Sequence, residues 1–187
     1  MENHKLAWAY SLTLRMYNTW LHGDPRLSVD PRNNKVGTPR ITPKPALKEA
    51  MEGLAHENPL ILNLTQRKTV LKSVIETCQY NHWKLLVAHI RSNHMHIVLQ
   101  SEKTIEQTMG KIKCYATKEL KKMHVELSQR KKFWSRHGST RNVWVPEEIF
   151  PRLYYVVRRQ GKEGALYYDK KFYDRFDEKL YESYFGG

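Results

Sequence analysis

The sequence predicts an α+β fold, a ferredoxin-like sandwich in which an antiparallel sheet carries helices on one face. Residues 6–17 alternate between large apolar side chains and small or polar ones, as a half-buried strand does. Residues 83–90 and 94–100 are two strand-like runs joined by Arg-Ser-Asn, which predicts a β-hairpin. Helical periodicity precedes and follows this hairpin. The resulting order of strand, helix, strand, strand and helix is typical of this fold class.

The other elements follow from periodicity and from residues that break helices. Gly, Pro and Asn are frequent in residues 18–45, which predicts a long loop insertion after the first strand. Thr65 is expected to cap the helix that precedes the hairpin, and Pro146 suits the first turn of a later helix. The expected helices span residues 46–57, 66–81, 103–124, 146–159 and 165–185.

The composition indicates one folded domain with an appendage. The chain has 187 residues, 40% of them hydrophobic, which suffices for a core. We expect a domain at residues 1–160, which includes the loop insertion, and a helical C-terminal tail at residues 161–187. Cys78 and Cys114 show no CxxC spacing, which argues against a disulfide scaffold and a zinc knuckle. With no secretion signal and no apolar run of about 20 residues, a cytoplasmic protein without a membrane partner is expected.

The charge balance predicts a polyanionic partner. Thirty-two Lys and Arg residues face 19 Asp and Glu residues, and the formal net charge is +13. Such an excess attracts nucleic acid, and a protein bound to DNA would lie at the nucleoid. Charge by itself leaves DNA and RNA equally open.

His94 and His96 form the first candidate site. Residues two apart on a strand share a face, so both imidazoles point the same way, and Met95 and Ile97 take the core face. Two imidazoles on one face can chelate a divalent metal. An isolated His-x-His pair, however, more often binds nothing.

The helix expected at residues 103–124 carries the second candidate site. Tyr115 lies about a quarter-turn from the centre of its apolar stripe, and Glu119 follows one turn later. Lys111, Lys118 and Lys122 lie on the outer side of the tyrosine. Viewed alone, this helix is better explained by a boundary aromatic residue and a solvated basic face than by a catalytic site.

The two sites together suit phosphodiester cleavage. A metal held by two histidines and a carboxylate polarises a phosphate, and a tyrosine hydroxyl can then attack it. Lysines neutralise the charge that develops. The product is a covalent phosphotyrosine. Tyr154, Tyr155, Tyr167 and Tyr168 have no metal motif nearby in the sequence, so they are not expected to be nucleophiles.

Three segments resemble the single-tyrosine HUH transposases, which are insertion-sequence-200-like, and in particular their REP-associated branch. These segments are SNHMHIVLQ, KIKCYATKEL and FWSRHGSTRNVW. The resemblance covers roughly residues 6–160. It implies Mg²⁺ or Mn²⁺ as cofactor, His94 and His96 as metal ligands, and Tyr115 as the nucleophile that becomes linked to a 5′-phosphate. The third ligand usually follows the tyrosine by one helical turn, often as Gln, and Glu119 occupies that position here.

The third segment adds expected DNA contacts. Arg136, His137 and Arg141 could hold phosphates or the base of a hairpin, although a turn with exposed basic residues explains them about as well. Trp134 and Trp144 could stack on unpaired bases, but tryptophans of this kind more often belong to the core.

The sequence-based hypothesis is a metal-dependent transposase, a monomer or homodimer, that cleaves and rejoins single-stranded, hairpin-marked DNA through a phosphotyrosine. The alternative is a non-catalytic or host-adopted protein that binds single-stranded DNA or RNA on the same fold. A replication-initiator-like nickase ranks lower because no helicase-like segment is present, and a zinc-site regulator lacks further ligands.

Overall fold

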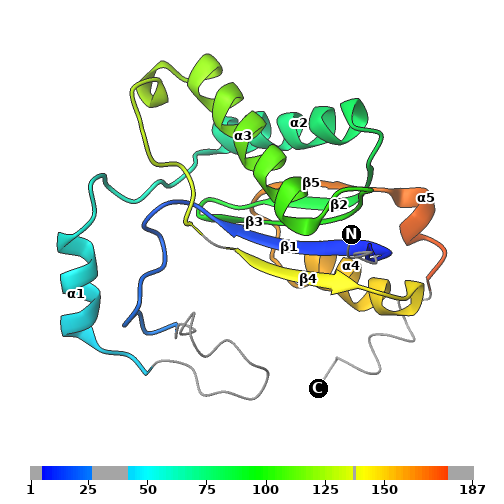
Figure 1. Ribbon diagram of the computed structural model, residues 1–187, viewed down its shortest axis with the longest axis horizontal. Helices are drawn as coiled ribbons and strands as arrows, with labels where there is room; N and C mark the ends of the chain where they lie inside the picture. Colours follow the sequence, from blue (N-terminus) through cyan, green and yellow to red (C-terminus); the bar gives the residue numbers. More distant parts are fainter. Residues whose placement is uncertain (1–5, 27–41, 137, 177–187) are drawn as a thin grey trace, which may run out of the picture.

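A five-stranded antiparallel sheet forms the centre of the molecule (Figure 1). The computed structural model describes residues 6–26, 42–136 and 138–176. The strand order is β4-β1-β3-β2-β5, so β1 and β3 are neighbours in the interior of the sheet. The strands are β1 (Ala9–Arg15), β2 (Lys84–Ile90), β3 (His94–Gln100), β4 (Ser139–Val143) and β5 (Ala165–Tyr168). The expected α+β class, the first strand and the hairpin are confirmed.

Four of the five expected helices form near their predicted positions. They are α1 (Pro45–Gly53), α2 (Leu64–Tyr80), α3 (Ile105–Met123) and α4 (Ile149–Arg158), the last preceded by a short 3₁₀ turn at Pro146–Glu148. The cap of α2 is Asn63 rather than Thr65. Its side chain accepts a hydrogen bond from the backbone N–H of Gln66, whose own side chain reaches back to Asn63. This reciprocal capping box satisfies two amides that the first turn leaves free. No helix in the described ranges is long and apolar enough to cross a membrane.

Helices α2 and α3 cover one face of the sheet (Figure 1). Leu12 and Leu14 of β1 point to this face together with Met95 and Ile97 of β3, and all four are buried. Three residues of α3 pack against them: Ile112, Ala116 and Leu120. Because these residues follow the helical period, α3 presents its opposite side to solvent.

A second helical layer, formed by α4 and the short α5 (Lys170–Tyr173), covers the other face of the sheet. Val87 and Val98 point to this face and pack with Phe150 and Leu153 of α4. The expectation of helices on one face therefore holds for α2 and α3, and α4 adds a layer on the face that carries the histidines.

The prediction of a helical C-terminal tail is wrong for residues 165–168, although residues 170–173 are helical. Residues 165–168 form β5, which pairs with β2 in the sheet, so residue 161 is not the end of the folded domain. Alternation explains the strand, since Ala165 and Tyr167 contribute to the α2–α3 side and Tyr168 to the α4 side. The four-residue spacing of aromatic residues suggested a helix, but pairing with β2 satisfies the backbone of both strands. The end of the expected helix, residues 177–185, lies outside the described residues.

Candidate functional site

His94 and His96 lie side by side on the α4 face of β3. Their ring centroids are 4.9 Å apart with an edge-to-face arrangement. Thr13 and Arg15 of β1 are their direct partners in the antiparallel ladder, so these four side chains share one face. The predicted common orientation of the two imidazoles is confirmed.

Hydrogen bonds fix the orientation of both rings. The Nδ1 of His94 lies 2.6 Å from Oδ1 of Asn93, and the Nδ1 of His96 lies 2.9 Å from Oγ1 of Thr13. Because a carbonyl oxygen only accepts, Nδ1 of His94 carries the proton and its Nε2 keeps a free lone pair. With Nδ1 engaged in each ring, Nε2 is the nitrogen left for a ligand.

Burial keeps both imidazoles neutral. Desolvation lowers the pKa of His94, and it lowers the pKa of His96 to about 4, with the neighbouring His94 as the second cause. Near neutral pH both rings are therefore uncharged, which is the form that binds a metal ion.

A cleft of about 870 Å³ opens over the histidine pair. The sheet forms its floor and α4 one of its walls. Tyr155 of α4 lines this cleft, and its ring lies edge-on to His96, with centroids 5.8 Å apart. Its side chain is half exposed, so the hydroxyl can be reached by a large substrate. Gln160, just beyond the end of α4, also lines the cleft, and its side chain partly offsets the lowering of the pKa of both histidines by burial.

Tyr115 and Glu119 do not join the histidines, and the single site predicted from the sequence is wrong in this respect. Both residues lie on α3, whose buried stripe packs on the face formed by Leu12 and Met95. The sheet therefore separates Tyr115 from His94. The sequence placed each residue correctly on its own element but could not tell which face of the sheet the helix covers.

The predicted DNA-contacting residues divide between the two faces. Lys111, Lys118 and Lys122 are exposed along α3, on the side away from the histidine cleft. Arg141 of β4 lines the cleft, whereas Arg136 is exposed and does not line it. His137 lies outside the described residues.

The two tryptophans of the third segment also differ. The Nε1 of Trp134 donates to Oγ1 of Thr117 at 2.8 Å, and its ring packs against the α2–α3 core, so it is structural. Trp144 is half exposed.

The donors in the cleft suit a divalent cation. Two neutral imidazoles and the amide oxygen of Gln160 offer nitrogen and oxygen ligands of the kind that Mn²⁺ and Mg²⁺ accept. Within the described ranges, no group of three His, Cys, Asp or Glu side chains is placed to hold a metal. Gln160 lines the cleft beside the two histidines, whereas Glu119 does not.

Sequence reasoning missed Tyr155 and Gln160, although a signal was present. The family resemblance calls for a tyrosine followed about one helical turn later by an amide, and Gln160 follows Tyr155 by five residues, which is more than one turn. The sequence does not predict Tyr155 as a nucleophile, because no metal motif lies near it in the sequence. The fold supplies that motif from β3, about sixty residues upstream.

His89 and Gly164 fasten α4 and β5 beside this cleft. His89 is buried opposite His96 in the ladder, and its Nδ1 lies 3.3 Å from the carbonyl oxygen of Val156, next to Tyr155. Gly164 approaches the same ring so closely that a Cβ would lie 2.3 Å from its Nε2 and 2.9 Å from the carbonyl oxygen of Ile90. A glycine is required here because neither neighbour has room to move.

We expect Gly164→Ala to lower the free energy of unfolding by about 1–3 kcal/mol, the usual cost of overpacking a filled site. Urea titration measures it. Gly110→Ala is the matched control: a Cβ at Gly110, inside α3, meets nothing within 4 Å, and alanine there should stabilise by about 0.5–1 kcal/mol. Equal stabilities of the two variants would contradict the role assigned to Gly164.

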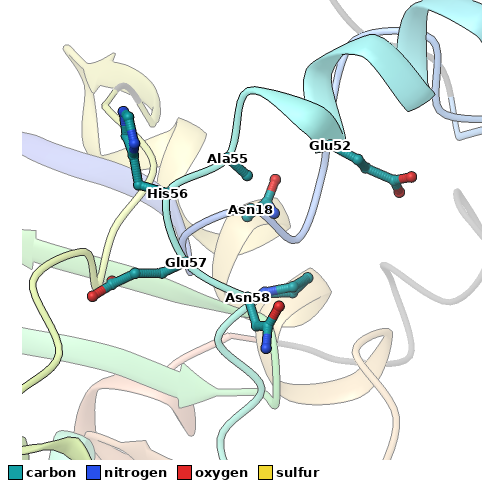
Figure 2. A pocket seen from close by; sticks show the side chains of 7 residues that line it. Asn18, Glu52, Ala55, His56, Glu57 and Asn58 are labelled. Carbon is teal, nitrogen blue, oxygen red and sulfur yellow. The ribbon is translucent and has the colours of Figure 1, made fainter.

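A second pocket, of about 410 Å³, lies between the end of α1 and the loop that follows it. The carboxylates of Glu52 and Glu57 in its wall point in different directions (Figure 2). Glu57 accepts hydrogen bonds from the backbone N–H groups of Lys131 and Lys132 at 2.8 and 2.7 Å. These bonds lower the pKa of Glu57 and connect two loops. The carboxylate of Glu57 in this pocket therefore has a structural role.

Comparison with known proteins gives one family match and several structural neighbours. Residues 57–141 match the family described as IS200-like transposase. No curated protein matches the chain. A solved structure of a REP-associated tyrosine transposase bound to a REP hairpin has a TM-score of 0.46 and 10% identity, covering 83% of this chain and 68% of that one. A candidate transposase from Deinococcus radiodurans R1 has a TM-score of 0.43 and 11% identity, covering 86% of this chain and 95% of that one. The matched segment holds the histidine strand β3, and this match confirms the resemblance predicted from the motifs.

Proposed function

We propose that this protein cleaves and rejoins single-stranded DNA, with Tyr155 as the nucleophile and His94, His96 and Gln160 as ligands of Mg²⁺ or Mn²⁺. The observation that carries the proposal is the convergence of Tyr155 and Gln160 on the histidine pair in one cleft. The net charge of +13 and the resemblance to hairpin-processing transposases support hairpin-marked DNA as the substrate.

The reaction can be written from the residues of this chain. The Tyr155 oxygen bonds to the scissile phosphorus and loses its proton, the bond from phosphorus to the 3′ oxygen breaks, and that oxygen leaves as a 3′-OH after taking up a proton. The 5′-phosphate remains on the tyrosine. A bound divalent cation would supply Lewis-acid polarisation of the phosphate. Attack of a 3′-OH on the phosphotyrosine reverses the step and rejoins a strand, so no external energy source is needed.

Metal removal tests the proposal. The full chain is incubated with Mn²⁺ and labelled single-stranded hairpin oligonucleotides, and adducts that survive denaturation are identified by mass spectrometry. We expect adducts with Mn²⁺, none after chelation with EDTA, and recovery when Mn²⁺ is restored. His96→Ala should abolish them, whereas His56→Ala, an exposed histidine outside the cleft, should not. Salt-sensitive binding without adducts, indifferent to Mn²⁺, would instead favour the non-catalytic binding protein.

A further inference from the structure

Arg15 lies in the histidine cleft, and the proposed phosphotyrosine reaction assigns it no role. It is the ladder partner of His94, and its side chain lines the cleft beside the histidine pair. Its guanidinium carbon lies 3.4 Å from the ring centroid of Trp20, which corresponds to a close stack on the aromatic face. Trp20 comes from the loop that follows β1 and lines the same cleft. The stack therefore holds a cation next to the histidines.

A second arginine lies against the same ring, and its charge is already balanced. The guanidinium carbon of Arg26 is 4.5 Å from the Trp20 centroid. Asp24 accepts from Nε and Nη2 of Arg26 at 2.7 and 2.6 Å, and Nη2 of Arg26 also donates to the carbonyl oxygen of Thr19. The hydrogen bonds from Arg26 lower the pKa of Asp24 to about 2, so the carboxylate stays ionised. Arg26 and Asp24 thus neutralise each other and brace the ring.

Among the described residues no carboxylate forms an ion pair with Arg15. The Asp24 carboxylate acts on Arg15 only through space, because it is already bonded to Arg26. Three arginines line the cleft, Arg15, Arg141 and Arg152, against one acid, Glu148. The Nε of Arg152 is buried and has no hydrogen-bond partner among the described residues. A cleft with excess positive charge and an unused donor is complementary to an anion.

We propose that Arg15 binds a non-bridging oxygen of the scissile phosphate and that Trp20 orients its guanidinium for this contact. The inference deepens the proposed function and rests on it. The planar guanidinium can donate two parallel hydrogen bonds to a phosphate, and the stack on Trp20 fixes its plane before DNA arrives. Trp20 is accordingly a positioning residue, not a platform for a DNA base, since guanidinium groups already occupy its ring.

A purely structural role for Arg15, fastening the loop of Trp20 to the sheet, makes a different prediction. A fastening residue affects every substrate alike, whereas a phosphate-binding residue matters only when the phosphate carries its charge. A hairpin oligonucleotide with a neutral methylphosphonate at the scissile position separates the two, because it leaves Arg15 no anionic oxygen to neutralise.

The experiment measures adduct formation by Arg15→Ala, Arg15→Lys and the matched control Arg175→Ala, an exposed arginine over the Phe172 ring outside the cleft. On the phosphate substrate we expect Arg15→Ala to be about 100-fold slower, the usual cost of one lost donor to a developing charge, and Arg15→Lys to recover only part of this. On the methylphosphonate, Arg15→Ala and the unmodified protein should differ by less than about threefold. Trp20→Leu should slow cleavage and Trp20→Phe should not, since only phenylalanine keeps a ring for the stack.

A measurement of DNA binding tests the role of Arg15 without requiring cleavage. Removing one phosphate contact should lower the slope of log affinity against log salt for a single-stranded oligonucleotide by about 0.7 in Arg15→Ala, with no change in Arg175→Ala. If the unmodified protein forms no adduct, the proposed function fails and this slope still decides the role of Arg15. Unchanged cleavage or slope in Arg15→Ala, or equal losses on both substrates, would overturn the inference.

Discussion

Tyr155→Phe is expected to abolish the covalent protein–DNA adduct, a loss of at least about 1,000-fold, while binding of the hairpin changes little. The phenol oxygen is the atom proposed to attack the phosphorus, and phenylalanine removes that atom only. The ring, which packs edge-on against His96, stays in place. Adduct is measured on denaturing gels with Mn²⁺ present, and affinity by fluorescence anisotropy with EDTA present.

Tyr115→Phe is the matched control for this experiment. Tyr115 is also a partly exposed tyrosine on a helix, but α3 places it on the other side of the sheet from the histidines. It should form adduct at the rate of the unmodified protein. Adduct that persists in Tyr155→Phe and vanishes in Tyr115→Phe would reverse the assignment and require α3 to reach the cleft of another copy.

Phe150→Ala is expected to lower the free energy of unfolding by about 3–5 kcal/mol, as deletion of a buried aromatic ring usually does. Phe150 is 1% exposed in the first turn of α4, and its ring centroid lies 5.5 Å from that of Tyr173 and 4.5 Å from that of Phe176. The substitution opens a cavity between α4, α5 and the sheet. Since a domain is typically stable by only about 5–15 kcal/mol, urea denaturation will register the loss easily.

The loss of packing in Phe150→Ala should also disturb the cleft, because α4 carries Tyr155 and is followed by Gln160. Adduct formation should fall in Phe150→Ala even where the protein is still folded, with partial recovery in Phe150→Leu. Tyr80→Ala is the control: this side chain is 79% exposed at the end of α2, and its loss should change stability by less than about 0.5 kcal/mol. A Phe150→Ala variant as stable as Tyr80→Ala would mean that α4 is not held as the structure indicates.

Local signals were sufficient for most of the individual elements. Alternation located β1, and the turn at residues 91–93 located the hairpin of β2 and β3. Both depend on neighbours in the chain, since the side-chain period of a strand and the geometry of a turn are local properties. The same period placed His94 and His96 on one face correctly.

Two misassignments arose where distant segments compete for one surface. Residues 165–168 have aromatic spacing that suits a helix, but they pair with the otherwise unpaired edge of β2 and form a strand. Tyr115 has the helical position and basic neighbours expected of a nucleophile. The apolar stripe of α3, however, packs on the Leu12 face of the sheet, so Tyr115 lies on that side.

The sequence by itself determined the family resemblance, the antiparallel α+β class and the histidine pair, because each follows from residues close together in the chain. Only the tertiary structure decided which tyrosine faces the histidines. A sheet has two faces, and which helix covers which one depends on the sum of apolar burial over the whole domain. That packing brings Tyr155 and Gln160 to His94 and His96, and it leaves Tyr115 on the far side.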